Sequence, residues 1–251
     1  MRGIIGIHLG VDETQLARIG ENGEPMLVFN NEFQSSTPTA VHFTNEKVII
    51  GNLAKDAAGI EEHAFAEFLR DIGSGITHKT PQGTFSPSDL CALMLRPLIG
   101  HFNEYYGEVS GESIAIPYNL GDEARLEILR AATLAGVYKP DLINDNTAEA
   151  LYLLNTHKLK KGKYLLVSLR AGTADVTIFE VERKSLSIAH VSGIQQLGLK
   201  DLTRCMSGIV SEKIAQKVGT KVTRDDLLME YCIGDYSLNN IILGLGTQNI
   251  F

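Results

Sequence analysis

The chain has 251 residues, 44% of them hydrophobic and 21% charged, so it can bury a large core and is not expected to be disordered. Lys+Arg 23 against Asp+Glu 30 gives a net charge of −7, and no basic cluster recurs that could follow a nucleic-acid backbone. Cys91, Cys205 and Cys232 fit neither a disulfide framework nor a zinc site. We find no pattern of a signal peptide or membrane span and expect a cytoplasmic protein with no direct nucleic-acid or membrane partner.

Short strands and amphipathic helices alternate along the first half of the chain. Apolar, β-branched residues predict strands over 3–9 and 15–19, joined by a turn that begins at Gly10. Ser86 can cap a helix that Gly107 ends. The other predicted elements are a strand pair over 40–43 and 47–50, a strand over 113–117, and a helix over 122–135 that stops at Gly136.

The second half repeats the pattern of the N-terminus. After a basic connector over 158–163, residues 165–172 match residues 4–10: each stretch is a buried strand that ends near a glycine turn, with another strand after it. Two such units can aim backbone N–H groups at one crevice, and N–H clusters of this kind bind phosphate oxygens. Two ordinary hairpins are the alternative. Helices are predicted over 147–157 and 200–217.

A series of short motifs carries a resemblance to a known family. The series is Ile4-Ile-Gly-Ile-His-Leu-Gly, Ser36-Thr-Pro-Thr, Ile50-Gly-Asn-Leu-Ala-Lys, Glu112-Ser-Ile-Ala-Ile-Pro-Tyr, Leu142-Ile-Asn-Asp-Asn-Thr-Ala-Glu-Ala, Val167-Ser-Leu-Arg-Ala-Gly-Thr-Ala-Asp-Val and Gln196-Leu-Gly-Leu-Lys-Asp. In order and spacing it resembles the nucleotide-binding domain of the seventy-kilodalton heat-shock chaperones, the DnaK type.

The resemblance implies an α/β, actin-like ATPase (ribonuclease H-like) fold, with duplicated β-sheet units and flanking helices. We expect residues 1–160 to form lobe I, with 40–112 as an inserted subdomain, and residues 161–251 to form a partial lobe II. In the family this domain continues with a glycine-rich segment that holds adenosine. Here 221–251 offers a helical stretch over 225–232 and a glycine motif over 243–248, so we expect a truncated second lobe and weak ATP or ADP binding.

The departures from the family pattern bear on catalysis. His8 and Ser168 stand where the family has aspartates that hold hydrated magnesium, and neither side chain suits that ion. Leu69 stands where the family has the lysine that orients the attacking water, unless the register slips to Arg70. Asp145 replaces a glutamate that is one methylene longer. Because phosphoryl transfer depends on positioning and on metal charge, we expect negligible ATP hydrolysis.

Other positions of the phosphate motifs are retained. Arg170 and Ala171 replace two glycines, but a phosphate cradle can survive without the catalytic groups. If catalysis persists, Asp145 and Thr173 are its candidate residues. The candidate phosphate-binding residues are Gly10, Val11, Asp12, Gly172, Thr173 and Gly198, and no metal-binding residue is predicted.

Each singled-out residue also has a plain structural interpretation. His8 can be a neutral imidazole that is hydrogen-bonded at a strand end. Ser168 can be satisfied within its own turn, and Asp145 can cap the helix that follows. Arg170 can grip a phosphate or lie solvated on the surface.

Pro117 and Arg125 match the proline and arginine through which the family couples its cleft to the surface that meets J-domain partners. The alternatives are a strand-end proline and an exposed helix arginine. The interpretation we favour is a regulatory member, impaired in ATP hydrolysis, that binds a J-domain co-chaperone and resembles the atypical members at the ribosome. An active ATPase of the same family and a sugar or acid kinase of the actin superfamily are the alternatives.

Overall fold

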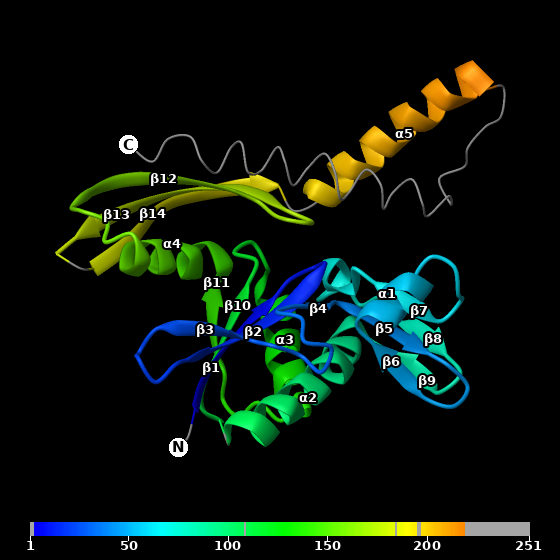
Figure 1. Ribbon diagram of the computed structural model, residues 1–251, viewed down its shortest axis with the longest axis horizontal. Helices are drawn as coiled ribbons and strands as arrows, with labels where there is room; N and C mark the ends of the chain where they lie inside the picture. Colours follow the sequence, from blue (N-terminus) through cyan, green and yellow to red (C-terminus); the bar gives the residue numbers. More distant parts are fainter. Residues whose placement is uncertain (1–2, 108, 184, 195–196, 219–251) are drawn as a thin grey trace. The chain divides into compact units, whose positions relative to one another are not determined.

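The computed structural model describes residues 3–107, 109–183, 185–194 and 197–218 (Figure 1). The chain divides into two compact units, which we call unit 1 (1–162 with 181–186) and unit 2 (163–180 with 187–251). The helix predicted over 225–232 and the glycine motif over 243–248 lie outside the described residues. None of the helices in the described part combines the length and hydropathy that a bilayer crossing requires.

Unit 1 is built on a mixed six-stranded sheet. The strand order is β11-β10-β1-β2-β3, and β4 also pairs with β2. The neighbours β11, β10 and β1 run parallel, whereas β1, β2 and β3 form an antiparallel meander. The strands are β1 (Gly3–Leu9), β2 (Glu13–Ile19), β3 (Pro25–Val28), β4 (Thr37–Pro38), β10 (Val109–Ile116) and β11 (Asp141–Asn144).

The first strand alternates between a core face and a more open face. Ile5, Ile7 and Leu9 are buried, whereas Ile4 is exposed and His8 is half-buried. This period of two places successive side chains on opposite faces of the sheet. The strand predicted over 3–9 is therefore confirmed, and its polar residue sits on the face that is not fully packed.

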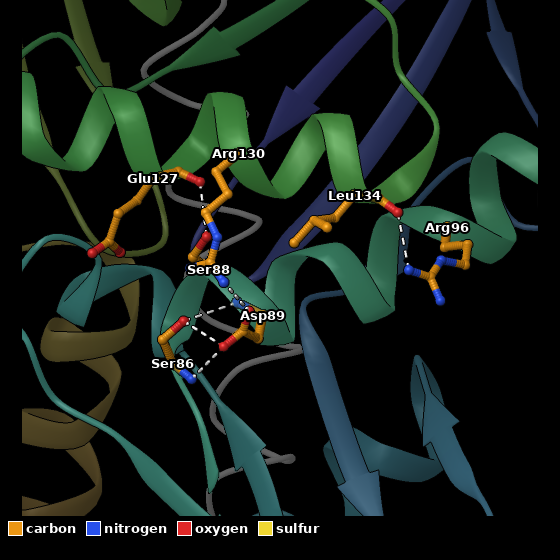
Figure 2. Close-up of polar contacts among 7 residues, drawn as sticks. All are labelled: Ser86, Ser88, Asp89, Arg96, Glu127, Arg130 and Leu134. Carbon is orange, nitrogen blue, oxygen red and sulfur yellow. Dashed lines mark hydrogen bonds and ion pairs between the residues drawn. The ribbon is translucent and has the colours of Figure 1, made fainter.

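Helices α2 (Pro87–Tyr106) and α3 (Asp122–Ala135) pack against each other and supply much of the core of unit 1. Ser88 donates to the Glu127 carbonyl at 2.9 Å, and Arg96 donates to the Leu134 carbonyl at 3.0 Å (Figure 2). The fully buried residues of α2 are Ser88, Leu90, Cys91, Met94, Leu95 and Phe102.

The predicted start of α2 is confirmed in detail. The Ser86 hydroxyl accepts the Asp89 N–H, and the Asp89 carboxylate accepts the Ser86 N–H, which completes a capping box with Pro87 at the first helical position (Figure 2). Pro97 lies inside α2 without ending it. At its C-terminus, Gly107 donates its N–H to the Asn103 carbonyl.

Smaller elements of unit 1 lie between β4 and α2 in the sequence. The strand pair predicted over 40–43 and 47–50 is confirmed, with Val41 opposite Ile50. Residues 64–85 add short strands that the sequence pattern does not predict. These elements are β5 (Ala40–Phe43), β6 (Val48–Ile50), α1 (Asn52–Ala57), β7 (Ala64–Ala66), the 3-10 helix η1 (Phe68–Asp71), β8 (His78–Thr80) and β9 (Gly83–Phe85); α4 (Asp145–Thr156) follows β11.

Unit 2 contains a three-stranded sheet and a long helix. Its strand order is β12-β13-β14. In β13, Asp175, Thr177 and Phe179 are buried, whereas Val176 and Ile178 are partly exposed, again with a period of two. The elements are β12 (Gly162–Leu169), β13 (Ala174–Glu182), β14 (Ser185–Ile194) and α5 (Leu199–Val218). The strand-turn-strand pattern that the sequence repeats is thus present in both units.

Candidate functional site

In unit 1 the predicted site residues gather where three parallel strands end. His8 of β1 lies opposite Ala115 of β10, and Ile116 of β10 lies opposite Asn144 of β11. Gly10, Pro117 and Asp145 each follow one of these strand ends, so the fold brings them to one edge of the sheet. Ligands of open α/β sheets bind at this carboxyl edge.

The β1–β2 turn is tight and leaves no space for a side chain at Gly10. The Gly10 N–H donates to the Glu13 carbonyl at 3.2 Å. A Cβ on Gly10 would lie 2.6 Å from that carbonyl oxygen and 3.1 Å from Cε1 of His8. The imidazole therefore lies directly beside the glycine turn.

The residues on either side of β4 hold this turn in place. Thr39 donates its hydroxyl to the Gly10 carbonyl and its N–H to the Asp12 carbonyl, both at 2.8 Å. Ser36 donates to the Glu13 carboxylate at 2.7 Å. The Asp12 carboxylate lies 3.6 Å from Nζ of Lys55. The motif around Thr37 thus acts as a brace for the first turn, and Asp12 is engaged with a lysine of α1.

Arg125 connects the ends of β10 and β11. Its guanidinium donates to the carbonyls of Tyr118 and Leu120 at 3.1 and 3.0 Å and to Oδ1 of Asn144 at 2.7 Å. Arg125 is therefore a partly buried connector between the loop after Pro117 and the start of α4. The alternative of an exposed helix arginine is wrong.

Asp145 is buried at the first residue of α4, with 6% of its surface exposed. The residue that precedes the helix is Asn144, whose side-chain oxygen accepts from Arg125 in place of a capping bond. Oδ1 of Asp145 accepts the Asn146 N–H at 2.7 Å. Helix α4 begins two residues before the predicted range, so Asp145 lies inside the helix and the interpretation of Asp145 as its cap is wrong.

Leu69 and Arg70 have structural partners in unit 1. Leu69 is 7% exposed and belongs to the hydrophobic core. Nε of Arg70 donates to the Glu67 carboxylate at 3.0 Å, with both side chains mostly buried. An alkyl group in the core cannot orient a water, and Arg70 is already paired beside it.

In unit 2 the turn between β12 and β13 packs against the start of α5. Ser168, Gly172 and Thr173 are buried there. The carbonyls of Arg170 and Ala171 accept the N–H groups of Leu199 and Lys200 at 2.8 and 3.0 Å. The fold thus brings the second and third predicted phosphate turns together within one unit.

Gly198 is required by this close approach. A Cβ at this position would lie 2.4 Å from the Ala171 carbonyl oxygen. The Gly198 N–H donates to the Asp201 carboxylate at 2.8 Å. The N–H groups of residues 198–200, which a phosphate could otherwise use, are all bonded to the protein itself.

Asp175 is a buried acid of this turn that the sequence pattern does not single out. It is the single acidic residue of the motif that begins at Val167, and its side chain is 2% exposed. Nη1 of Arg170 lies 2.5 Å from its carboxylate. Arg170 is therefore paired with a buried acid, and the interpretation of a solvated surface arginine is wrong. The sequence signal that could have identified Asp175 is its place as the aspartate next to the last residue of that motif.

The donor groups of the two turns do not suit magnesium, which prefers oxygen ligands that balance its charge. His8 offers a ring nitrogen, Ser168 offers a neutral hydroxyl, and Asp175 is engaged with a guanidinium. Across the described residues, no group of three or more histidine, cysteine, aspartate or glutamate side chains is placed to hold a metal ion. Burial raises the pKa of the Cys91 thiol, as is typical of a structural cysteine in a core.

A pocket of about 180 Å³ lies elsewhere in unit 1. Its lining includes Asn30, Glu32, Ile50, Pro97 and His101. None of the predicted site residues lines it. Thr37 also lines the pocket, so the pocket borders the segment that braces the first turn.

Glycine turns at the carboxyl ends of parallel strands in a mixed α/β unit are typical of nucleotide-binding proteins. A family model described as Hsp70 protein matches residues 4–82 and 70–232. The chain therefore belongs to the Hsp70 family, which confirms the resemblance of the sequence motifs and implies the actin-like ATPase fold. Domains of this family in general bind ATP or ADP with magnesium and typically work with J-domain co-chaperones.

Proposed function

We propose that this chain is a regulatory Hsp70-family nucleotide-binding domain that is impaired in ATP hydrolysis and acts by binding a J-domain co-chaperone. In this proposal residues 1–160 form lobe I, with 40–112 inserted, and 161–251 belong to lobe II. The proposed site of action is the cytoplasm. By resemblance to the atypical members of the family, this chain acts there at the ribosome. Any ATP or ADP is bound weakly and without need of magnesium.

One observation carries the loss of hydrolysis: the groups at the catalytic positions are chemically unsuited to it. An imidazole and a hydroxyl stand at His8 and Ser168, and Leu69 is packed in the core. Phosphoryl transfer has little covalent chemistry for the protein to do, so it relies on metal charge and on positioning. Losing both leaves Asp145 without a cation or an oriented water to act on.

The arrangement of Pro117 and Arg125 supports the proposed binding of a J-domain co-chaperone. Arg125 ties the loop after Pro117 to Asn144, next to Asp145, through three hydrogen bonds. A conformational change at the carboxyl edge of the sheet can therefore reach α3 through the three hydrogen bonds of Arg125. This connection is retained although the catalytic groups are replaced.

Phosphate release by the full chain, with ATP and magnesium, tests the loss of hydrolysis. We expect the wild type and Asp145→Asn to release phosphate at the same background rate. An active chaperone of the family serves as the positive control. Turnover by the wild type at a family rate, abolished in Asp145→Asn, would favour the active ATPase in which Asp145 and Thr173 carry catalysis.

Calorimetry with a purified J-domain tests the partner. We expect binding by the wild type that does not require nucleotide, and about tenfold weaker binding by Arg125→Gln, because that variant releases two carbonyls and the Asn144 amide oxygen. Arg130→Gln is the matched control, since Arg130 also lies on α3 but bonds to Asp89. Absence of J-domain binding by the wild type would contradict the proposal.

A further inference from the structure

The Arg170–Asp175 pair occupies the place in unit 2 where the family motif has a glycine and an acid. The Asp175 side chain is 2% exposed and that of Arg170 is 21% exposed. Burying a carboxylate is costly unless a cation or several donors accompany it. In this chain the accompanying cation belongs to the protein.

The backbone around the pair is closely packed. A Cβ at Gly193 of β14 would lie 2.6 Å from the Asp175 Cβ, so this part of β14 approaches β13 closely. The Arg170 N–H donates to the Thr173 carbonyl at 2.8 Å and closes the turn. Residue 170 is therefore fixed at both its backbone and its guanidinium.

The same turn fixes the start of α5. The Arg170 carbonyl accepts the Leu199 N–H, and the next carbonyl accepts the Lys200 N–H. Arg170 thus joins a buried acid, the β12–β13 turn and the first residues of α5. An arginine guanidinium keeps its charge at all relevant pH values, so this connection needs no ligand.

We propose that Arg170 is a resident counter-ion: its guanidinium supplies the positive charge that the buried Asp175 carboxylate requires, and so holds the β12–β13 turn and the start of α5 together without metal or nucleotide. The proposal rests on the family assignment of the turn and extends the proposed function, because it names the residue that makes the site independent of magnesium. Arg170 acts here as a positioning residue.

Amide hydrogen exchange of Leu199 and Lys200 in the full chain tests the proposal, since both N–H groups are bonded to the turn. In EDTA we expect slow exchange in the wild type and exchange at least about tenfold faster in Arg170→Gln, as follows from removing one partner of a largely buried ion pair. Arg170→Lys should recover part of the protection because it restores the charge. Excess magnesium chloride should leave wild-type exchange unchanged.

Arg130→Gln is the control, since it makes the same substitution at an exposed ion pair of unit 1. Equal exchange in Arg170→Gln and the wild type would overturn the proposal. So would wild-type protection that rises when magnesium is added, or an equal effect from Arg130→Gln. ATP turnover by the wild type would contradict the proposed function but would leave this exchange result standing, so the two failures are distinguishable.

Discussion

At Leu69, introducing the lysine of the family pattern should destabilise the protein without producing ATP hydrolysis. Its side chain lies in the core of unit 1, at the position where the family resemblance places a lysine. Leu69→Lys would bury an ammonium group without a designed partner, so we expect the free energy of unfolding to fall by about 3 kcal/mol or more. We expect no gain in ATP turnover. Urea unfolding followed by circular dichroism measures the first effect, and phosphate release measures the second.

The control for this variant is Leu69→Met, which keeps the volume and the apolar character and should cost less than about 1.5 kcal/mol. A stable Leu69→Lys chain that hydrolyses ATP would mean that the 3-10 helix η1 can turn this position toward the nucleotide. That result would contradict the assignment of Leu69 to the core.

The environment of single residues was the least predictable feature of the sequence. The pattern places His8 at the end of a strand, and this is confirmed. The sequence could not show whether Leu69 or Arg70 faces the core, because η1 is a single short turn and too short for a hydrophobic periodicity. The pairing of Arg170 with Asp175 depends on a turn between two strands, which composition does not specify.

At the scale of elements, the capping box of α2 makes stability depend on pH. Burial would raise the pKa of Asp89, but hydrogen bonds from Ser86 and the charge of Arg130 together hold it below its ordinary value of 3.8. A lowered folded pKa stabilises the protein above pH 3.8, and this contribution is lost as the pH falls through the lowered value. We expect Asp89→Ala to cost about 1 kcal/mol at neutral pH.

The difference between the wild type and Asp89→Ala should therefore shrink below pH 3.8. Urea unfolding across a pH series measures it. Arg130→Gln separates the exposed ion pair from the cap and should cost less than about 1 kcal/mol. A difference that stays constant down to strong acid would show that Asp89 acts through packing and not through its charge.

Elements with strong local signals were predicted well, and short ones were not. Ser86, Pro87 and Asp89 define the start of α2 by sequence alone. The start of α4 was placed two residues late, because the hydrogen bond from Arg125 to Asn144 orders the end of β11 and no local pattern encodes it. Strands such as β8 and β9 are three residues long, too short for alternation to be distinctive.

At the scale of the molecule, the collinear order of motifs identified the family although no single motif did. The order was informative because it reflects the path of the chain through a duplicated fold. The same order could not show that the second and third predicted phosphate turns bond to each other within unit 2. That contact joins residues 170–171 to residues 199–200, and it requires the glycine at position 198 to permit the approach.

The proposed loss of magnesium binding is assigned to three positions, so it should be reversed only when all three change together. We expect the combined variant His8→Asp, Ser168→Asp and Arg170→Gly to bind ADP at least about tenfold more tightly with magnesium than in EDTA, because carboxylate oxygens are the ligands that this ion prefers. The wild type should show no such difference. Calorimetry with ADP under both conditions measures it, and circular dichroism verifies that the variant is folded.

The single variants are the controls for this prediction. Each should leave binding indifferent to magnesium, since the family resemblance assigns these positions to a single cation and the effects of such residues are not additive. Phosphate release should stay at background in the combined variant, because Leu69 remains in the core. Magnesium-dependent ADP binding by the wild type would show that the chain holds the ion through groups other than these three, and the assignment of the lost charge to His8, Ser168 and Arg170 would then be wrong.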